Sequence, residues 1–427
     1  MRPPYFSVSA RNGTTQRFFT RPKFAIPWAS TVVPHRLRRK FRLTRSKLRT
    51  RQAPASSLAS LQLSFNPADT LTTLRAHRWS YYDVQYILLA LVGIFSVCVI
   101  QEPGYLVKST IATLLVIFLI LPLTQQFFLP FLPIAAWLVL FLACNEYRPA
   151  IWVRVLPTLE NILYGANLSN ILSAHKAVTL DVLAWLPYGV THLGAPFACS
   201  ALIFLFAPPG STPVFARAFG YMNLIGVTIQ LCFPCSPPWY ENQYGLAPAS
   251  YSIKGSPAGL RAIDELFGIH FYTSTFTASP VVFGAFPSLH SGCATLETLF
   301  LAHLFPRLRP LFILYTLWLW WATMYLSHHY AVDLAGGSLL SAAIFLAAKS
   351  KFLPRLQPGK MFRWDYDFVE CGDDARVDRY TYGMVEDEGF DHLDSDDGHV
   401  GPPSSVASSS GITSFGGARS PSESGST

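Results

Sequence analysis

The chain has few charged residues for its length. Asp, Glu, Lys and Arg make up 14% of its 427 residues, whereas an ordinary soluble domain carries about 25%. Hydrophobic residues account for 51%, and the mean hydropathy is +0.30 although both ends of the chain are polar. This composition excludes a soluble globular enzyme, a disordered protein and a small disulfide scaffold. A polytopic membrane protein with polar tails remains.

Two other signals are missing. The N-terminal segment has no apolar stretch long enough for a signal-peptide core. The seven cysteines, mostly inside apolar runs, do not form a secreted disulfide framework. The N-terminal segment is Arg-rich and acid-poor, as mitochondrial transit peptides are. The alternative is a disordered cytosolic tail that contacts anionic lipid.

Charge is unevenly distributed between the two ends. Residues 1–78 contain sixteen Lys and Arg against one acidic residue, whereas residues 351–427 contain seven against fourteen. Basic flanks of membrane spans stay cytosolic, so this charge is explained without a nucleic-acid partner. We predict a basic, disordered cytosolic tail over residues 1–80 and a transmembrane catalytic domain over 81–350. Residues 351–427 form an acidic, then Ser/Gly-rich, disordered cytosolic tail.

Uncharged runs long enough to cross a bilayer predict an all-α polytopic membrane protein with about eight transmembrane helices. Six or seven are near alternatives. The expected spans are Val84–Ile100, two spans within Ser109–Cys144 divided at Pro122, a kinked span within Val182–Ala216 that ends near Phe206 after a re-entrant or interfacial piece, Ala218–Phe233, Phe286–Phe305, Leu311–Leu326 and Leu334–Ala348.

The positive-inside rule then orients the helices. Both tails lie in the cytosol, as does the short loop 306–310 with its two arginines. The loops Asn145–Leu180 and Pro234–Ala285 and the turn Ser327–Tyr330 lie on the opposite, luminal side.

A first polar cluster lies at the start of a predicted span, in Phe286–Gly292. Ser288 is a good helix N-cap, which would place His290 in the first turn. Unpaired backbone N–H groups at a helix start can hold a phosphate. The alternative is a capped transmembrane helix with an interfacial histidine.

A second cluster, Tyr325–Asp333, contains His329 and Asp333 four residues apart. On a helix they would share a face, so that the carboxylate could hold one ring nitrogen and leave the other free as base or nucleophile. The alternative is a His–Asp pair that only satisfies its own polar groups. The spacing favours His329 over the neighbouring His328.

Both clusters lie at luminal ends of spans, and together they suit phosphoryl transfer. One histidine attacks phosphorus, Asp333 orients it, and the other histidine protonates the leaving oxygen. Two histidines and an aspartate could also bind zinc. The chain has no HExxH or similar paired spacing, so we predict no metal and no cofactor.

These two motifs resemble the second and third motifs of the type-2 phosphatidic acid phosphatase superfamily. Longer strings between about residues 145 and 350 resemble the fungal inositol phosphorylceramide synthases. They are Ile162–Ser169, Leu183–Gly189, Gly194–Phe197, Phe219–Leu224, Pro237–Tyr240, Phe283–Thr295 and Trp318–Trp321.

The resemblance implies a six-helix phosphatase-like core and a phosphotransferase of sphingolipid biosynthesis. Such an enzyme moves phosphoinositol from phosphatidylinositol to ceramide and releases diacylglycerol through a phosphohistidine. It implies that His329 is the nucleophile, Asp333 its orienting partner, and His290 the acid and then the base. It also implies a Golgi membrane location with a luminal active site, and a small membrane regulatory subunit.

Two other functions stay open. A lipid phosphate phosphatase would use the same three residues with water as acceptor. A transporter would use intramembrane His, Asp and Glu as a proton relay, but no inverted repeat supports it.

The phosphate-binding residues are less well indicated. Where the superfamily has Ser-Arg before the third-motif histidine, this chain has Ala322 and Thr323. Phe141 stands where the first motif has lysine. The phosphate charge still needs partners. Candidates for substrate binding are Ser288 and Ser291 at the helix start and the luminal cations Arg148, Arg154, Lys176, Lys254 and Arg261.

Overall fold

The computed structural model describes residues 51–54, 61–77, 79–102, 104–366 and 368–371. The regular secondary structure of these residues is almost entirely helical, as predicted, and the chain is a multi-pass membrane protein. The other parts of the two predicted tails lie outside the described residues. The longer helices form eight continuous stretches. They are α5 Val84–Val99, α6 Tyr105–Ile120, α7 Pro122–Ala143, α10 Val178–Trp185, η3 Leu186–Thr191, α11 His192–Phe206, α12 Ser211–Cys232, α16 Leu289–Leu304, α17 Arg309–Tyr325 and α18 Ala331–Lys351. One of the stretches consists of the three segments α10, η3 and α11.

A helix or continuous helical stretch lies at each of the eight positions where a span is predicted. Five are long and apolar enough to cross a membrane: Tyr81–Val99, Pro122–Glu146, Val178–Phe206, Ser211–Cys232 and Ala331–Lys351. α6 is apolar but has 16 residues, and α16 and α17 have 16 and 17. A straight span needs about 20 residues, so the count of eight stays a prediction.

Proline determines one boundary predicted from the sequence and lies inside a helical stretch at a second predicted site. α6 ends at Ile120 and α7 begins at Pro122. Proline is favoured at the first helical position because it needs no partner for an N–H. In the next span, α10 continues through η3, a π-helical turn that includes Pro187, into α11. The predicted kinked span therefore ends at Phe206 as expected, but the piece before it is a continuous part of the helix.

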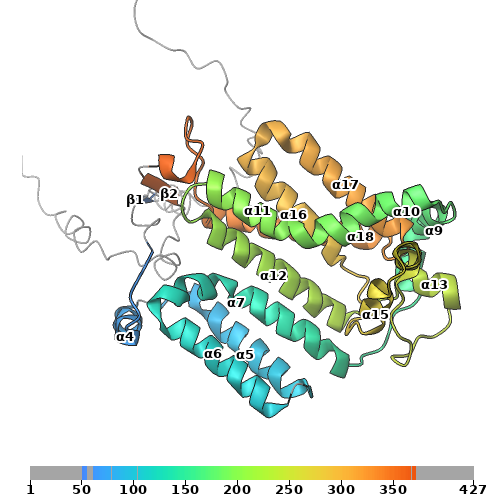
Figure 1. Ribbon diagram of the computed structural model, residues 1–427, viewed down its shortest axis with the longest axis horizontal. Coiled ribbons are helices and arrows are strands. Elements are labelled where there is room, and N and C mark those ends of the chain that lie inside the picture. Colours follow the sequence, from blue (N-terminus) through green and yellow to red (C-terminus); the bar gives the residue numbers. More distant parts are fainter. Residues whose placement is uncertain (1–50, 55–60, 78, 103, 367, 372–427) are drawn as a thin grey trace, which may run out of the picture. The chain divides into compact units, whose positions relative to one another are not determined.

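α12 lies between α7 on one side and α11, α16 and α18 on the other (Figure 1). A Cβ atom added at Gly220 of α12 would lie 2.6 Å from the backbone nitrogen of Ile134 in α7. Glycine therefore permits these two helices to approach closely. Around α12 the main apolar core joins buried side chains such as Ile203, Phe215, Met222, Leu296, Phe300 and Phe345.

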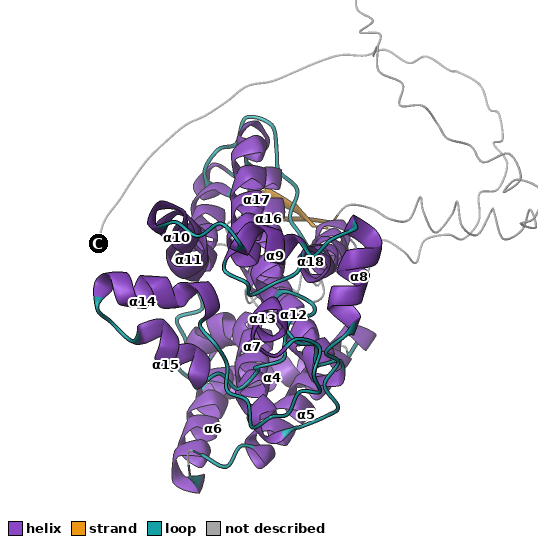
Figure 2. Cartoon of the chain, turned by 90° about the vertical axis from the view of Figure 1, so that its right-hand side faces the viewer, coloured by secondary structure: helices purple, strands orange, loops and turns teal. Residues whose placement is uncertain are grey.

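Short helices gather at one end of the long ones, on the right of Figure 1 and facing the viewer in Figure 2. They come from the two loops predicted as luminal. They are α8 Val155–Tyr164, α9 Leu168–Ser173, α13 Pro238–Tyr244, α14 Arg261–Phe267 and α15 Phe271–Thr277. The same end carries the start of α16 and the turn between α17 and α18, where the two polar motifs lie. Single 3-10 turns occupy Tyr81–Asp83, Cys144–Glu146, Ala258–Leu260, Pro306–Leu308 and Arg363–Asp365.

Regular structure also occurs inside the segments assigned to the tails. α4, Pro67–Ala76, begins after Asn66, whose side chain accepts a hydrogen bond from the Ala68 nitrogen. Two short strands, β1 Arg51–Pro54 and β2 Phe368–Cys371, pair in antiparallel register. They bring a segment of each predicted tail together.

The orientation gives a first testable prediction. Lys254 and Arg307 are both exposed, in loops predicted to lie on opposite sides of the membrane. In sealed vesicles whose cytosolic face is outward, Arg307→Cys should react with an impermeant maleimide at once. Lys254→Cys should react only after the vesicles are opened. The unaltered chain measures background from its own cysteines, and labelling of both variants from one side would contradict the orientation.

Candidate active site

The start of α16 is held by the two serines of the first motif. Ser288 is the N-cap, and its side-chain oxygen accepts a hydrogen bond from the Ser291 nitrogen at 3.3 Å. The Ser291 hydroxyl donates to the Leu334 carbonyl of α18 at 2.7 Å and accepts from the indole nitrogen of Trp320 in α17 at 2.7 Å. Both serines are fully buried. The Ser291 hydroxyl therefore joins three helices, and contact of either serine with substrate stays a prediction.

A tight turn positions His329. The backbone nitrogens of His328 and His329 donate to the Thr323 carbonyl at 3.0 and 3.3 Å, and Ser327 has a positive φ of 60°. Thr323 stands where the superfamily has arginine, and here its backbone supports the turn. His329 therefore precedes α18, which begins at Ala331, instead of lying on a helix with Asp333 as the spacing suggested.

His329 and Asp333 nevertheless meet. The Nδ1 atom of His329 lies 2.9 Å from Oδ2 of Asp333, and the two side chains are 8% and 0% exposed. Because a carboxylate only accepts, Nδ1 carries the proton and donates it. The Nε2 atom of His329 is then the unprotonated nitrogen, which a nucleophile requires.

His290 faces that nitrogen. Its Nδ1 atom lies 3.1 Å from Nε2 of His329, so that His290 donates and His329 accepts. The backbone nitrogen of Ser288 also donates to the Asp333 carbonyl at 3.0 Å, which ties the two motifs together. The structure thus brings His290, His329 and Asp333 into one hydrogen-bonded chain, which we call the catalytic cluster.

Glu160 of α8 supports the cluster and was not identified from the sequence. It is fully buried, and its two carboxylate oxygens accept from the backbone nitrogens of Ala331 and Val332 at 3.2 Å. Burial raises the pKa of this carboxyl, while these backbone N–H groups lower it. Glu160 therefore caps the N-terminus of the helix that carries Asp333. No local signal predicts this, because 171 residues separate Glu160 from Ala331.

Two rings beside His290 were also missed. Tyr188 of η3 stacks on His290 with ring centroids 4.6 Å apart, and His192 of α11 lies 4.7 Å away at 39°. Both lie in or next to the Leu183–Gly189 string. The sequence signal in this string was a proline and a glycine inside a helical run. A π-helical turn accommodates both residues.

Of the five cations predicted to be luminal, only two line the cavity next to the catalytic turn. Arg261 and Lys176 both line a cavity of about 300 Å³ whose wall includes Ser327 of the catalytic turn. The Lys176 ammonium donates to the Tyr325 carbonyl at 2.8 Å and lies over the Tyr325 ring. Burial lowers its pKa, which the nearby Asp181 carboxylate partly offsets. Arg148, Arg154 and Lys254 are exposed and do not line this cavity.

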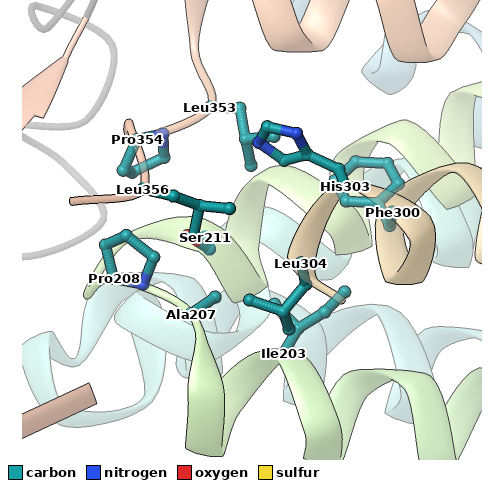
Figure 3. Close-up of a pocket in the computed structure, with 10 residues that line it drawn as sticks. All are labelled: Ile203, Ala207, Pro208, Ser211, Phe300, His303, Leu304, Leu353, Pro354 and Leu356. Atoms are coloured by element: carbon teal, nitrogen blue, oxygen red, sulfur yellow. The ribbon is translucent and has the colours of Figure 1, made fainter. Parts of the chain in front are cut away.

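A second hollow lies at the other end of α16 (Figure 3). Its lining is mostly apolar, with Ser211 and His303 as the polar side chains. The hollow has a volume of about 10 Å³, which is at the lower limit of what one water requires. Since His303 and His290 are about 20 Å apart along the helix, this hollow is not part of the active site. Within the described ranges, no three His, Cys, Asp or Glu residues are grouped to hold a metal ion.

Comparison with known proteins agrees with the geometry. A family model described as the PAP2 superfamily matches residues 151–347. The inositol phosphorylceramide synthase catalytic subunit of Schizosaccharomyces pombe is 51% identical over 377 residues, which cover 87% of this chain and 89% of that protein. The inositol phosphorylceramide synthase of Candida albicans is 46% identical over 338 residues (78% and 72%). The catalytic subunit of Saccharomyces cerevisiae is 44% identical over 330 (76% and 82%). No solved structure matches the chain.

The hydrogen bond from His329 to Asp333 predicts a specific effect of one substitution. Asp333→Asn presents an amide that can donate to Nδ1 and favour the wrong tautomer, so the turnover rate should fall on the order of 10²–10⁴-fold. The rate is measured in membranes, normalised to protein amount. Asp181→Asn is the matched control, because Asp181 is also buried but accepts from the Tyr325 hydroxyl. Equal losses in the two variants would show that Asp333 has no special role.

Proposed function

The chain belongs to the inositol phosphorylceramide synthase family, within the PAP2 superfamily, and we propose that its catalytic cluster transfers phosphoinositol from phosphatidylinositol to ceramide. The observation that most supports phosphoryl transfer is the hydrogen-bonded chain from Asp333 through His329 to His290. The similarity to named inositol phosphorylceramide synthases supports ceramide as the acceptor. It supplies an oriented nucleophile and an acid within reach of one phosphorus atom.

The first half of the reaction forms a phosphohistidine. Nε2 of His329 forms a bond to phosphorus, while the bond from phosphorus to the diacylglycerol oxygen breaks. His290, in its protonated form, gives its proton to that oxygen, and Asp333 stabilises the positive charge that develops on the His329 ring. Phosphatidylinositol must replace the hydrogen bond between the two histidines, whose nitrogens lie 3.1 Å apart.

The second half regenerates the cluster. The primary hydroxyl oxygen of ceramide forms a bond to phosphorus as the bond to His329 Nε2 breaks, and the hydroxyl proton passes to His290. His290 is protonated again and the products are diacylglycerol and inositol phosphorylceramide. In these steps, neither half requires a metal or a cofactor.

The phosphate charge needs a positive partner, and among the five predicted luminal cations we favour Arg261 as the one that draws the headgroup toward the site. Arg261 lines the cavity beside Ser327, together with Lys176. Positive charge there attracts an anionic headgroup toward the catalytic turn. Ser288 and Ser291 would act on substrate indirectly, through the helix start that they hold.

The same proposal includes the side of the membrane on which the active site lies and a partner subunit. The active site faces the lumen, because the basic tail keeps the opposite side cytosolic. From the family resemblance we assign this membrane to the Golgi apparatus. Two of the relatives are named catalytic subunits, and we extend this to a complex of the present chain with a small membrane regulatory subunit.

A phosphorus-tracing assay tests the function. Membranes that contain the chain are given phosphatidylinositol labelled in its headgroup phosphate and a ceramide analogue. Label should move to ceramide with the unaltered chain and not with His329→Ala, because the alanine cannot form the phosphohistidine. Label appearing only in water-soluble inositol phosphate would identify a hydrolase instead. Conversion that persists in His329→Ala would exclude the proposed nucleophile.

A further inference from the structure

The catalytic cluster is common to a transferase and a phosphatase, so something around it must disfavour water as acceptor. We propose that Tyr188 and His328 are positioning residues: with Phe276 they form a ring column that holds His290 and keeps luminal water from the phosphohistidine. This inference rests on the proposed function, and it concerns residues that do not touch the reacting atoms.

The column consists of four rings from four separate segments. Tyr188 lies between His290, at 4.6 Å and 20°, and His328, at 5.2 Å and 17°. Phe276 of α15 covers the other face of His328 at 4.7 Å and 26°. Near-parallel rings at these distances attract one another beyond the area they bury. The ring of His290 is thus fixed on one face.

His328 is part of this wall and not a second nucleophile. Its Nε2 atom donates to the Pro257 carbonyl at 3.2 Å, and both ring faces are covered. Burial, with a smaller effect of His329, lowers its pKa to about 3, so the ring is neutral at physiological pH. A neutral, stacked imidazole behaves here as an aromatic side chain with one hydrogen bond.

The column lies between the luminal cavity and His290. Ser256 and Ala258 line that cavity, and Pro257 between them holds His328. The order from the cavity inward is therefore Pro257, His328, Tyr188 and His290. Luminal water that reaches the cavity meets the stacked rings of His328 and Tyr188 before it meets His290. Excluding water in this way prevents hydrolysis of a reactive intermediate.

The backbone is arranged to allow this packing. At Gly189 an added Cβ atom would lie 2.5 Å from the Tyr272 hydroxyl and 2.6 Å from the Trp185 ring. Glycine therefore lets η3 approach α15, which carries both Tyr272 and Phe276. The Trp185 indole nitrogen donates to the Tyr272 hydroxyl at 2.6 Å and locks the two segments together. A π-helical turn of this kind is often found at functional sites.

The test measures how the label is divided between the two acceptors, ceramide and water. Membranes with each variant receive headgroup-labelled phosphatidylinositol and a ceramide analogue, and the ratio of inositol phosphorylceramide to free inositol phosphate is measured. This ratio does not depend on how much folded protein is present. Tyr188→Phe keeps the ring and should leave the ratio within about twofold. Tyr188→Leu removes the stacking and should lower the ratio about threefold to tenfold, the factor that one aromatic pair contributes.

Controls make the outcome decisive. Phe197→Leu, at a ring on α11 that is 78% exposed, should leave the ratio unchanged. If Tyr188→Leu cannot be recovered from membranes, His328→Phe and His328→Leu repeat the comparison from another segment. An unchanged ratio in both Leu variants would overturn the ring column, even if total activity falls. If the unaltered chain transfers no label to ceramide, the proposed function fails instead, whatever the variants do.

Discussion

The buried hydrogen bond between His329 and Asp333 is the interaction on which the rest of the structure depends. A carboxylate with no exposed surface must be paired, because burial of an unpaired charge costs far more than a protein can supply. The structure meets this requirement by bringing three segments to α18. The turn after α17 supplies the imidazole, α8 supplies the Glu160 cap, and the start of α16 donates a backbone N–H to the Asp333 carbonyl. Each of these contacts also sets the geometry of the catalytic cluster.

The membrane explains why these polar contacts gather at one end of the helices. Within the hydrocarbon region, polar backbone and ionisable groups are costly, so helices carry the chain across and irregular segments remain at the ends. The short helices α8, α9, α13, α14 and α15 cover the catalytic end. A lipid substrate can then present its headgroup at the interface while its chains stay in the bilayer. A phosphotransferase that joins two lipids needs this arrangement.

Transfer and hydrolysis differ only in the oxygen that attacks phosphohistidine. The catalytic cluster by itself does not choose between them, since His290 can take a proton from either acceptor. The choice therefore depends on which molecule reaches the site, which is a matter of access and packing. The ring column of Phe276, His328, Tyr188 and His290 stands on the side of the luminal cavity. It gives the neighbouring histidine of the catalytic turn a role different from that of His329.

The sequence alone determined the helical membrane architecture, the division of the helices at Pro122, and the three residues of the catalytic cluster. Each of these rests on a local pattern: an uncharged run, a proline, or polar residues a few positions apart. It also placed His329 in the turn Ser327–Tyr330, but it did not reveal the Thr323 carbonyl that holds this turn. Glu160, Tyr188 and His192 were also missed, since each contacts residues more than 90 positions away in the chain. Only the tertiary structure decided these contacts, because hydrogen bonding and ring stacking between distant segments leave no periodic signal in the sequence.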